Sequence, residues 1–296
     1  NIMQGVEYRV LSGQLSQDIQ GISYDSRQVK PGDLFICISG LKSDGHDFVE
    51  HAINQGAKAL LVEKDVPVKD DMAVLLTPGC RKAMPVAAAN FFGHPSRDIK
   101  LVGVTGTNGK TTTTHLIKAI LEEQGATVGI MGTLYASFGD YTKTLNNTTP
   151  ESVDIEEFIN RVREQGGQYV VMEVSSHALD MGRVDEMFFH SAVFTNLTQD
   201  HLDYHQSMDK YREAKLKLFA RISPENGQFS IINADDPAKA EFIRASNQTS
   251  LTYGIENEAD IKAIDLQSTL KGSRFTVIYQ NDNFSVKMKL IGLFNV

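Results

Sequence analysis

The sequence lacks two features that would each assign it to a distinct class of protein. Basic residues do not outnumber acidic ones: 29 lysines and arginines stand against 37 acids, a formal net charge of −8. General nucleic-acid-binding proteins normally have a basic surface, so this charge argues against that class. No apolar run approaches the roughly 20 residues that a membrane-spanning helix needs. We therefore expect no nucleic-acid partner and no membrane insertion.

Cysteine is also scarce. The two cysteines, Cys37 and Cys80, form no metal-ligand spacing, and we expect them to be buried thiols in a reducing compartment. The first residues, Asn1-Ile2-Met3, do not begin a charged and then apolar signal peptide. Apolar residues make up 41% of the chain and charged residues 22%, which is ordinary for a globular protein. These features predict a cytoplasmic enzyme.

The length of 296 residues suggests about two domains. Residues 1–98 predict a small α/β domain, and the segment His94-Pro95-Ser96 is the expected linker because it interrupts a helical pattern. The elements expected in this first domain are strands over 33–38 and 59–62 and helices over 48–55 and 81–92.

Residues 99–296 predict a second domain in which strands alternate with helices. Such alternation indicates an α/β fold with a mostly parallel sheet and ligands beyond the carboxyl ends of its strands. The expected strands are 101–104, 128–131, 168–174, 191–196 and 228–233, and the expected helices include 155–164 and 208–222. The helix after the first strand is expected to end at Gly125 and to bury Leu116, Ile117, Ile120 and Leu121. Beyond Asp260, short extended runs predict a meander at one edge of the domain.

The segment 102–112 is the most specific motif, because it combines a short strand, a glycine-rich turn and a helix start. Gly106 and Gly109 allow a tight turn whose N–H groups point at an anion. Lys110 can reach terminal phosphates, and the Thr111 hydroxyl can ligate magnesium. The full phosphate-loop pattern has a further glycine five residues before Gly109, where this chain has valine. A plain structural turn remains the alternative, although a turn needs neither the lysine nor the threonines.

Two further strand ends carry polar side chains. Glu173 follows an apolar strand and could ligate magnesium opposite the phosphate loop; the alternative is a hydrated surface carboxylate. His201 could be a metal ligand whose tautomer is fixed by Asp200 or Asp203. Spacing alone favours the alternative, in which Asp200 caps a helix beside a structural histidine.

Two more segments are ambiguous by pattern. Lys215 lies in a helical stretch, 211–219, and by pattern alone is a solvated lysine. The segment 146–150, Asn-Asn-Thr-Thr-Pro, has side chains suited to hydrogen bonding with sugars, amides or phosphates, but without context it is only a turn.

Together, these motifs resemble those of the Mur ligases, the ATP-dependent amide-forming enzymes of peptidoglycan synthesis. Thr105–Thr112 is similar to the phosphate loop of that superfamily, which also occurs in cyanophycin synthetases and, as a close variant, in folylpolyglutamate synthases. Other segments resemble the branch that adds the third residue of the stem peptide. These segments are Asp25-Ser26-Arg27 with Pro31–Phe35, Asn147–Pro150, Glu173–Leu179 and Asn196–His205. The resemblance covers essentially the whole chain.

The resemblance implies a set of site residues. ATP would be bound by Gly106, Thr107, Asn108, Gly109, Lys110, Thr111 and Thr112, with Asn295 near the adenine. The uridine end of the substrate would be held by Tyr24, Ser26, Leu41, Lys42 and Ser43. The muramoyl-dipeptide would contact Asn147, Thr148, Thr149, Ser175 and Arg183. Mg²⁺ would be held by Thr111, Glu173, His201 and Lys215, the lysine as a carbamate. Lys110, Lys215 and His201 would be the catalytic residues. Met181 stands where some relatives have glutamine, which puts one substrate contact in doubt.

The implied substrates are ATP, UDP-N-acetylmuramoyl-L-alanyl-D-glutamate and an amino acid. The D-glutamyl carboxylate would attack the γ-phosphate to give an acyl phosphate, and the amine would then displace phosphate to form the amide. Magnesium ions and Lys110 would stabilise the transferring phosphoryl group. We expect a monomer. Two alternatives are another ligase of this type, D-glutamate-adding or cyanophycin-like, and a nucleotide-binding module that ligates nothing.

The family's third domain binds the incoming amino acid and closes over ATP. In the resemblance it follows the segment 291–296, so we expect this chain to lack it. The chain should then bind the UDP-sugar without completing ligation, and the identity of the added amino acid is not readable.

Overall fold

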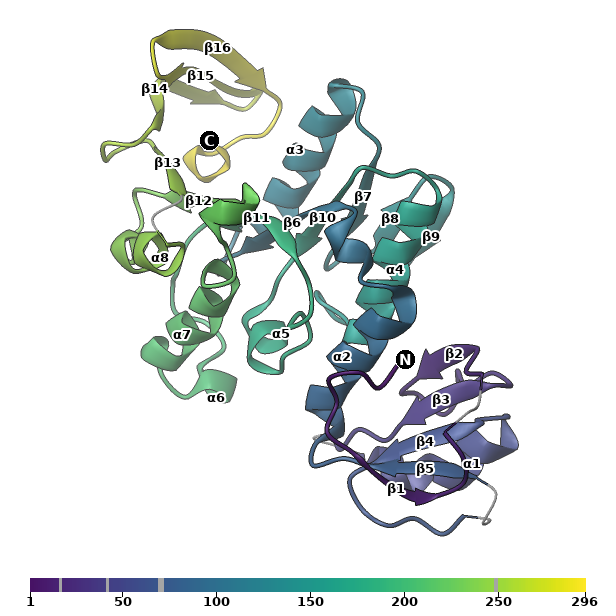
Figure 1. Cartoon of the computed structure of the whole chain (residues 1–296). Helices are drawn as coiled ribbons and strands as arrows, with labels where there is room; N and C mark the ends of the chain where they lie inside the picture. Colours follow the sequence, from purple (N-terminus) through teal and green to yellow (C-terminus); the bar gives the residue numbers. More distant parts are fainter. Residues whose placement is uncertain (16–17, 41–42, 69–71, 248–249) are drawn as a thin grey trace. The chain divides into compact units, whose positions relative to one another are not determined.

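The computed structural model describes residues 1–15, 18–40, 43–68, 72–247 and 250–296, and its contacts group them into two units. The first unit comprises residues 1–95, 151–160 and 181–187, and the second comprises 96–150, 161–180 and 188–296. Each unit is built on one β-sheet (Figure 1). The domain boundary expected near residue 98 stays a prediction. No helix in the described part of the chain combines the length and the apolar composition needed to cross a membrane.

The first unit has a five-stranded sheet in the order β1-β5-β4-β3-β2, in which only β1 is antiparallel to its neighbour. The strands are β1 (Arg9–Ser12), β2 (Gly21–Ser23), β3 (Asp33–Ile36), β4 (Ala59–Val62) and β5 (Ala73–Leu76). The helices are α1 (Val49–Asn54) and α2 (Cys80–Phe92), with a 3₁₀ turn, η1 (Gly45–Phe48), before α1.

The central strands of this sheet are apolar on both faces because both faces are covered. Leu34, Ile36 and Leu61 pack in one cluster with side chains of α2. Phe35 and Leu60 face the other way and pack in a second cluster with side chains of α1. Continuous apolar strands are typical of a sheet that is covered on both sides. The strands and helices expected here from the sequence are confirmed, with ends shifted by one or two residues.

The second unit has an eleven-stranded sheet in the order β16-β15-β14-β13-β12-β11-β6-β10-β7-β8-β9. Its strands are β6 (Lys100–Thr105), β7 (Val128–Met131), β8 (Ala136–Phe138), β9 (Tyr141–Lys143), β10 (Tyr169–Glu173), β11 (Phe189–Phe194), β12 (Phe229–Asn233), β13 (Ser250–Gly254), β14 (Ile261–Thr269), β15 (Gly272–Tyr279) and β16 (Asp282–Met288). The helices of this unit are α3 (Lys110–Glu123), α5 (Ser176–Asp180), α6 (Leu202–His205), α7 (Met208–Phe219) and α8 (Lys239–Ala245). Helix α4 (Ser152–Glu164) is divided between the units, since residues 152–160 belong to the first and 161–164 to the second.

The centre of this sheet is parallel, which confirms the expected fold class. β6 lies between β10 and β11 and is parallel to both. Its register pairs Val104 with Glu173 and Thr105 with Phe194. The carboxyl ends of these three strands therefore meet at one edge, where the phosphate-loop motif begins. The expected meander is also confirmed, because β14, β15 and β16 are antiparallel at one end of the sheet (Figure 1).

Two of the side chains expected to be buried by α3 are exposed. Leu116 is 37% exposed and Ile120 is 64% exposed, so that part of the prediction is wrong. Ile117 and Leu121 do pack, partly buried, against a cluster of sheet valines. The reason is that these two residues are four apart and share the helix face turned to the sheet, whereas Ile120 lies off that face.

Candidate functional site

The loop between β6 and α3 has a backbone that only glycine accommodates at two positions. Gly106 has φ 151° and Gly109 has φ 85°. A Cβ atom on Gly106 would lie 1.9 Å from Thr195 Oγ1, so the loop packs directly against the residue that follows β11. Gly109 is the N-cap of α3, a helix of 14 residues, and no side chain caps that end. An uncapped helix N-terminus behind a glycine-rich loop has the geometry that binds phosphate.

The loop is braced by the segment after β11. Asn196 Oδ1 accepts the Asn108 N–H at 3.0 Å, and Thr195 Oγ1 donates to the Asn108 carbonyl at 2.7 Å. The Thr107 hydroxyl accepts from the Thr198 N–H at 3.0 Å and lies 3.2 Å from the hydroxyl of Tyr211. These bonds hold the loop in place without using the N–H groups at the start of α3.

Two lysines share one carbonyl of this loop. Lys110 Nζ donates to the carbonyls of Gly106 at 3.0 Å and Thr107 at 2.8 Å. Lys215 Nζ, from α7, also donates to the Gly106 carbonyl, at 2.8 Å. Burial lowers the pKa of Lys110, and the charges of Glu173 and Asp200 oppose that shift.

The interpretation of Lys215 as a solvated lysine is wrong. Its side chain is among the largest fully buried ones, because α7 turns Tyr211, Ala214, Leu218 and Phe219 inward on the same face. Its ammonium group lies 4.4 Å from the centre of the Tyr211 ring. Burial, and secondarily the charge of Lys110, lowers the pKa of Lys215 to about 7. A lysine with this environment has a substantial neutral, nucleophilic fraction at neutral pH.

Glu173 is buried at the end of β10 and is held by three donors. Its Oε1 accepts from the Thr111 hydroxyl at 2.9 Å and from the Thr133 N–H at 2.8 Å, and its Oε2 accepts from the Thr133 hydroxyl at 3.1 Å. A Cβ atom on Gly132 would lie 2.2 Å from Oε1, so glycine is needed for this approach. The interpretation as a hydrated surface carboxylate is therefore wrong. A carboxylate and a threonine hydroxyl beside a phosphate loop are oxygen ligands that fit Mg²⁺.

His201 lies in a separate group of aromatic side chains. Its ring is 5.0 Å from that of His177 and 6.0 Å from that of Tyr211, and Nε2 is 3.5 Å from Asp200 Oδ2. His201 itself is the N-cap of α6, so Asp200 does not cap that helix with its side chain. In the described residues, no hydrogen bond or ion pair joins His201 to Glu173, and no three His, Cys, Asp or Glu side chains form a metal-binding group. His201 as a metal ligand stays a prediction.

The expected dipeptide contacts in the second unit surround Glu173. The Thr149 hydroxyl donates to the Glu173 carbonyl at 2.9 Å and accepts from the Ser175 N–H at 3.0 Å. Thr148 Oγ1 is 3.1 Å from Thr133 Oγ1, and Asn147 is exposed. Ser175 caps α5, since its Oγ accepts from the Ala178 N–H at 3.2 Å. The structure thus brings Thr148, Thr149 and Ser175 near one residue, Glu173, through its backbone carbonyl and through Thr133.

A pocket of about 540 Å³ lies beside the phosphate loop in the second unit. Gly109 and Thr112 line it together with Asn295, which the family resemblance implies to be near the adenine. Leu116, exposed from the helix, is also part of its apolar wall. The Asn295 side chain donates to the Ile291 carbonyl at 2.8 Å.

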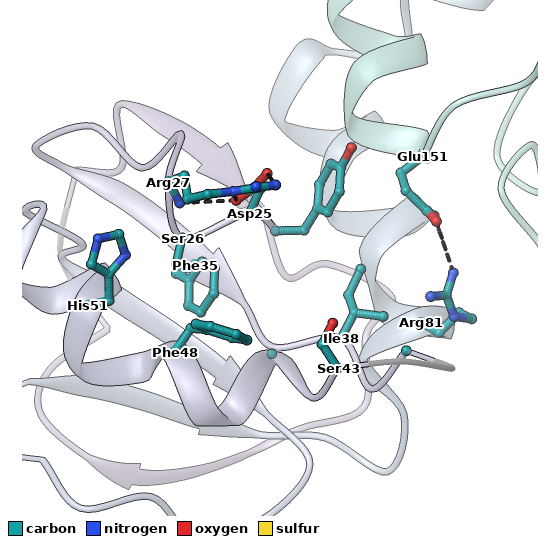
Figure 2. Close-up of a pocket in the computed structure, with 13 residues that line it drawn as sticks. Asp25, Ser26, Arg27, Phe35, Ile38, Ser43, Phe48, His51, Arg81 and Glu151 are labelled. Carbon is teal, nitrogen blue, oxygen red and sulfur yellow. Dashed lines mark hydrogen bonds and ion pairs between the residues drawn. The ribbon is translucent and has the colours of Figure 1, made fainter. Parts of the chain in front are cut away.

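The first unit has a pocket of about 610 Å³ that contains the expected uridine contacts (Figure 2). Tyr24, Ser26 and Ser43 line it, whereas Leu41 and Lys42 lie outside the described residues. The Tyr24 hydroxyl donates to Asp154, and burial raises the pKa of Tyr24. Arg183 is also in this unit and forms an ion pair with Glu151 at 2.9 Å.

The wall of this pocket is tied to the start of α2 through one buried histidine. His46 Nδ1 lies 2.5 Å from Asp44 Oδ1, and Nε2 accepts the Glu63 N–H at 2.9 Å. Glu63 Oε1 in turn accepts the Cys80 N–H at 2.7 Å. This chain of bonds links the loop after β3, the end of β4 and the first turn of α2.

Sequence reasoning missed Thr133 and Arg81. Thr133 follows β7, and the rule that polar residues after parallel strands gather at one edge would have identified it. Arg81, which lines the first-unit pocket and contacts Glu151 at 3.2 Å, gave no signal because it opens an ordinary-looking helix.

We predict that Gly106→Ala disrupts the loop. The new methyl group would clash with Thr195 Oγ1, so ADP affinity should fall at least about tenfold and stability by about 1–3 kcal/mol. Gly125→Ala is the matched control, because Gly125 also has a positive φ, 81°, but no atom lies within 4 Å of its Cβ position. Calorimetric ADP titration and urea unfolding measure both effects. Unchanged ADP affinity in Gly106→Ala would contradict the close packing.

The pKa of Lys215 predicts a pH-dependent stability. The unfolded chain holds this proton up to about pH 10.5, while the folded chain releases it near pH 7, so the unfolded state binds more protons between these values. Stability from this group therefore rises with pH across that window, by at most about 1.4 kcal/mol per pH unit. Lys215→Met loses this dependence.

The stability of Lys215→Met relative to the unsubstituted chain should accordingly be greatest at about pH 7 and should shrink towards about pH 9. Lys217→Met, on the same helix at a site 44% exposed, should show no such trend. Urea unfolding at several pH values tests this, and a constant difference between Lys215→Met and the unsubstituted chain would contradict the assigned burial cost.

Comparison with known proteins agrees with the geometry. The Mur ligase middle domain profile matches residues 104–296, and the profile of the Mur ligase family, catalytic domain, matches residues 18–95. A protein of Syntrophomonas wolfei named UDP-N-acetylmuramoyl-L-alanyl-D-glutamate–2,6-diaminopimelate ligase is 51% identical over 295 residues, which is 100% of this chain and 60% of that protein. A protein of the same name from Caldanaerobacter subterraneus is 42% identical, with the same coverage.

A solved structure of a ligase of this name aligns with a TM-score of 0.81 at 29% identity, covering 97% of this chain and 59% of the other. The chain thus spans about 60% of the length of the relatives it matches. The match over 193 of its 296 residues by the middle-domain profile (104 through 296) is enough to assign the family. On this evidence, the chain belongs to the Mur ligase family.

Proposed function

We propose that this chain provides the nucleotide-sugar and ATP sites of a ligase that adds the third amino acid to UDP-N-acetylmuramoyl-L-alanyl-D-glutamate. The relatives' names support 2,6-diaminopimelate as that amino acid. The observation that carries the proposal is the hydrogen bond, 2.9 Å long, between Thr111 of the phosphate loop and the buried Glu173. It supports the proposal because a carboxylate and a hydroxyl side by side at a phosphate loop are the oxygen ligands that suit a nucleotide-bound Mg²⁺.

In this proposal the phosphate loop holds ATP through the N–H groups at the start of α3. Lys110, which now donates to two loop carbonyls, would turn its ammonium group to the terminal phosphates. Magnesium, held by Thr111 and Glu173 with His201 as a further candidate ligand, would supply charge neutralisation. The pocket beside the loop, which includes Asn295, would take the adenine.

Lys215 is proposed to act as a carbamate. Its neutral amine would attack carbon dioxide, forming an N–C bond and releasing one proton, and the product would carry a carboxylate-like group. Burial and the lowered pKa of about 7 support this, because an ammonium ion cannot attack. The modification would replace a buried positive charge with a negative one, next to cationic Lys110 and the proposed metal.

The ligation itself would proceed by activation of a carboxylate. The D-glutamyl carboxylate oxygen attacks the γ-phosphorus of ATP and ADP leaves; the incoming amine then attacks the acyl carbon and phosphate leaves. Thr148, Thr149 and Ser175 lie around Glu173 and support binding of the acceptor near the phosphate loop. Arg183 would offer the rest of its planar fork to a substrate anion while it keeps its ion pair with Glu151. We also propose that the protein is cytoplasmic, because ATP and nucleotide-activated sugars are cytoplasmic substrates, and that it is a monomer.

Calorimetric titration of the chain with UDP-N-acetylmuramoyl-L-alanyl-D-glutamate tests this proposal. We expect it to bind at least about tenfold more tightly than UDP-N-acetylmuramoyl-L-alanine, because only the former has the D-glutamyl carboxylate. Lys110→Ala should lower ATP affinity at least about tenfold and leave UDP-dipeptide affinity within about twofold. Lys118→Ala, at a surface ion pair on the same helix, is the control.

Preference for the shorter nucleotide would instead indicate a D-glutamate-adding ligase. Equal loss of both ligands in a folded Lys110→Ala variant would contradict the proposed division of roles. ATP binding without either UDP-sugar would favour a nucleotide-binding module.

A further inference from the structure

Arg81 lies at one end of the first-unit pocket, and its ionic partner, Glu151, is shared with a second arginine. It belongs to the first turn of α2 and lines the pocket with Tyr24, Ser26 and Ser43. Its NH1 atom lies 3.3 Å from Glu151 Oε1 and 3.2 Å from Oε2, both long for a charge-assisted hydrogen bond. The side chain remains 31% exposed. Figure 2 shows the guanidinium turned towards Glu151 at the edge of the pocket.

Glu151 already has a second, closer cation. Arg183 NH2 lies 2.9 Å from Glu151 Oε1, and the side chain of Arg183 is only 13% exposed. The Glu151 side chain is itself 11% exposed, so it needs a cationic partner. Because Arg183 supplies one, Arg81 can leave Glu151 without stranding a buried negative charge.

The other pair of opposite charges in the pocket, Arg27 and Asp25, is hydrogen-bonded to itself. Arg27 donates to Asp25 through Nε at 2.9 Å and NH2 at 2.7 Å, a bidentate pair whose charges cancel. The bond from Arg27 holds the pKa of Asp25 below its ordinary value. Among the charged residues that line the pocket, Arg81 is therefore the cation whose counter-ion is shared with a second arginine.

We propose that Arg81 binds the diphosphate of the nucleotide-sugar in this pocket, exchanging Glu151 for phosphate oxygens while Arg183 keeps Glu151 paired. This inference rests on the proposed function, which places a uridine nucleotide here. A guanidinium fork matches two phosphate oxygens at once, which a lysine cannot do. Its anchoring supports the role, since the neighbouring Cys80 N–H is bound to Glu63 and α2 begins at a fixed place on the pocket wall.

The arrangement also gives Glu151 a function. Its ion pair with Arg81 holds that side chain at the pocket edge, so little side-chain entropy remains to be lost when a phosphate binds. The pocket volume of about 610 Å³ lies within the range of small-molecule sites, which is ample for a nucleoside diphosphate.

Calorimetric titration with UDP and with uridine separates this role from a structural one. We expect Arg81→Gln to lower UDP affinity at least about tenfold and to leave uridine affinity within about twofold, because uridine has no phosphate. Arg81→Lys should lie between, since it keeps the charge and loses the fork. Lys82→Gln, an exposed residue in the same turn with the same change of charge, should match the unsubstituted chain.

Three outcomes overturn the inference. Unchanged UDP affinity in Arg81→Gln overturns it and leaves the proposed function intact. Equal loss of UDP and uridine in folded Arg81→Gln and Arg81→Lys would assign Arg81 a structural role instead. Absence of UDP binding by the unsubstituted chain would overturn the assignment of the pocket, and the inference with it.

Discussion

The site in the second unit depends on the hydrogen bonds that the buried carboxylate of Glu173 accepts. Glu173 accepts hydrogen bonds from Thr111 after β6 and from both the N–H and the hydroxyl of Thr133 after β7. Its own carbonyl accepts from Thr149, so one residue connects three segments that are far apart in the sequence. A buried ionised group is costly unless its hydrogen bonds are made, and these partners therefore fix where the segments lie.

The phosphate loop lies beside that carboxylate, which Thr111 contacts, and two lysines bind the loop's backbone. Lys110 and Lys215 come from different helices and converge on one carbonyl, that of Gly106. Two ammonium groups so close repel, and their proximity contributes to the lowered pKa of Lys215. A phosphate anion would relieve this repulsion, which is why the arrangement fits an anionic ligand better than an empty structural turn.

Local pattern and strand topology predicted much of this structure. The parallel centre of the sheet, the loop after β6 and the gathering of polar residues at the strand ends follow from alternating strands and helices, because parallel strands end at one edge. Lys215 could not be read from its pattern, since a helix face that is polar in sequence can still be turned inward by the elements that pack on it. The family resemblance, not the periodicity, indicated its importance. The predicted burial of Ile120 was wrong, because an apolar residue at helical spacing need not lie on the helix face that meets the sheet.

Contacts between segments that are far apart in the chain could not be predicted from the sequence. Nothing local links Arg81 to Glu151 and Arg183, which are 70 and about 100 residues further along the chain. His201 is a different case. The family resemblance implies that it is a metal ligand together with Glu173, but no hydrogen bond or ion pair joins these two side chains in the described residues. The His201 side chain lies with those of His177 and Tyr211, and its role as a metal ligand stays a prediction.

In the proposed function, Glu173 and Thr111 hold the metal of a bound nucleotide. Titration of the chain with Mn²⁺ in the presence of ADP, followed by electron paramagnetic resonance, tests it most directly. Glu173→Gln should weaken Mn²⁺ binding at least about tenfold while leaving metal-free ADP affinity within about twofold, because the amide keeps the hydrogen-bonding oxygen and loses the charge. Glu123→Gln, exposed at the end of α3, is the control. Equal Mn²⁺ affinity in Glu173→Gln and the unsubstituted chain would contradict the claim.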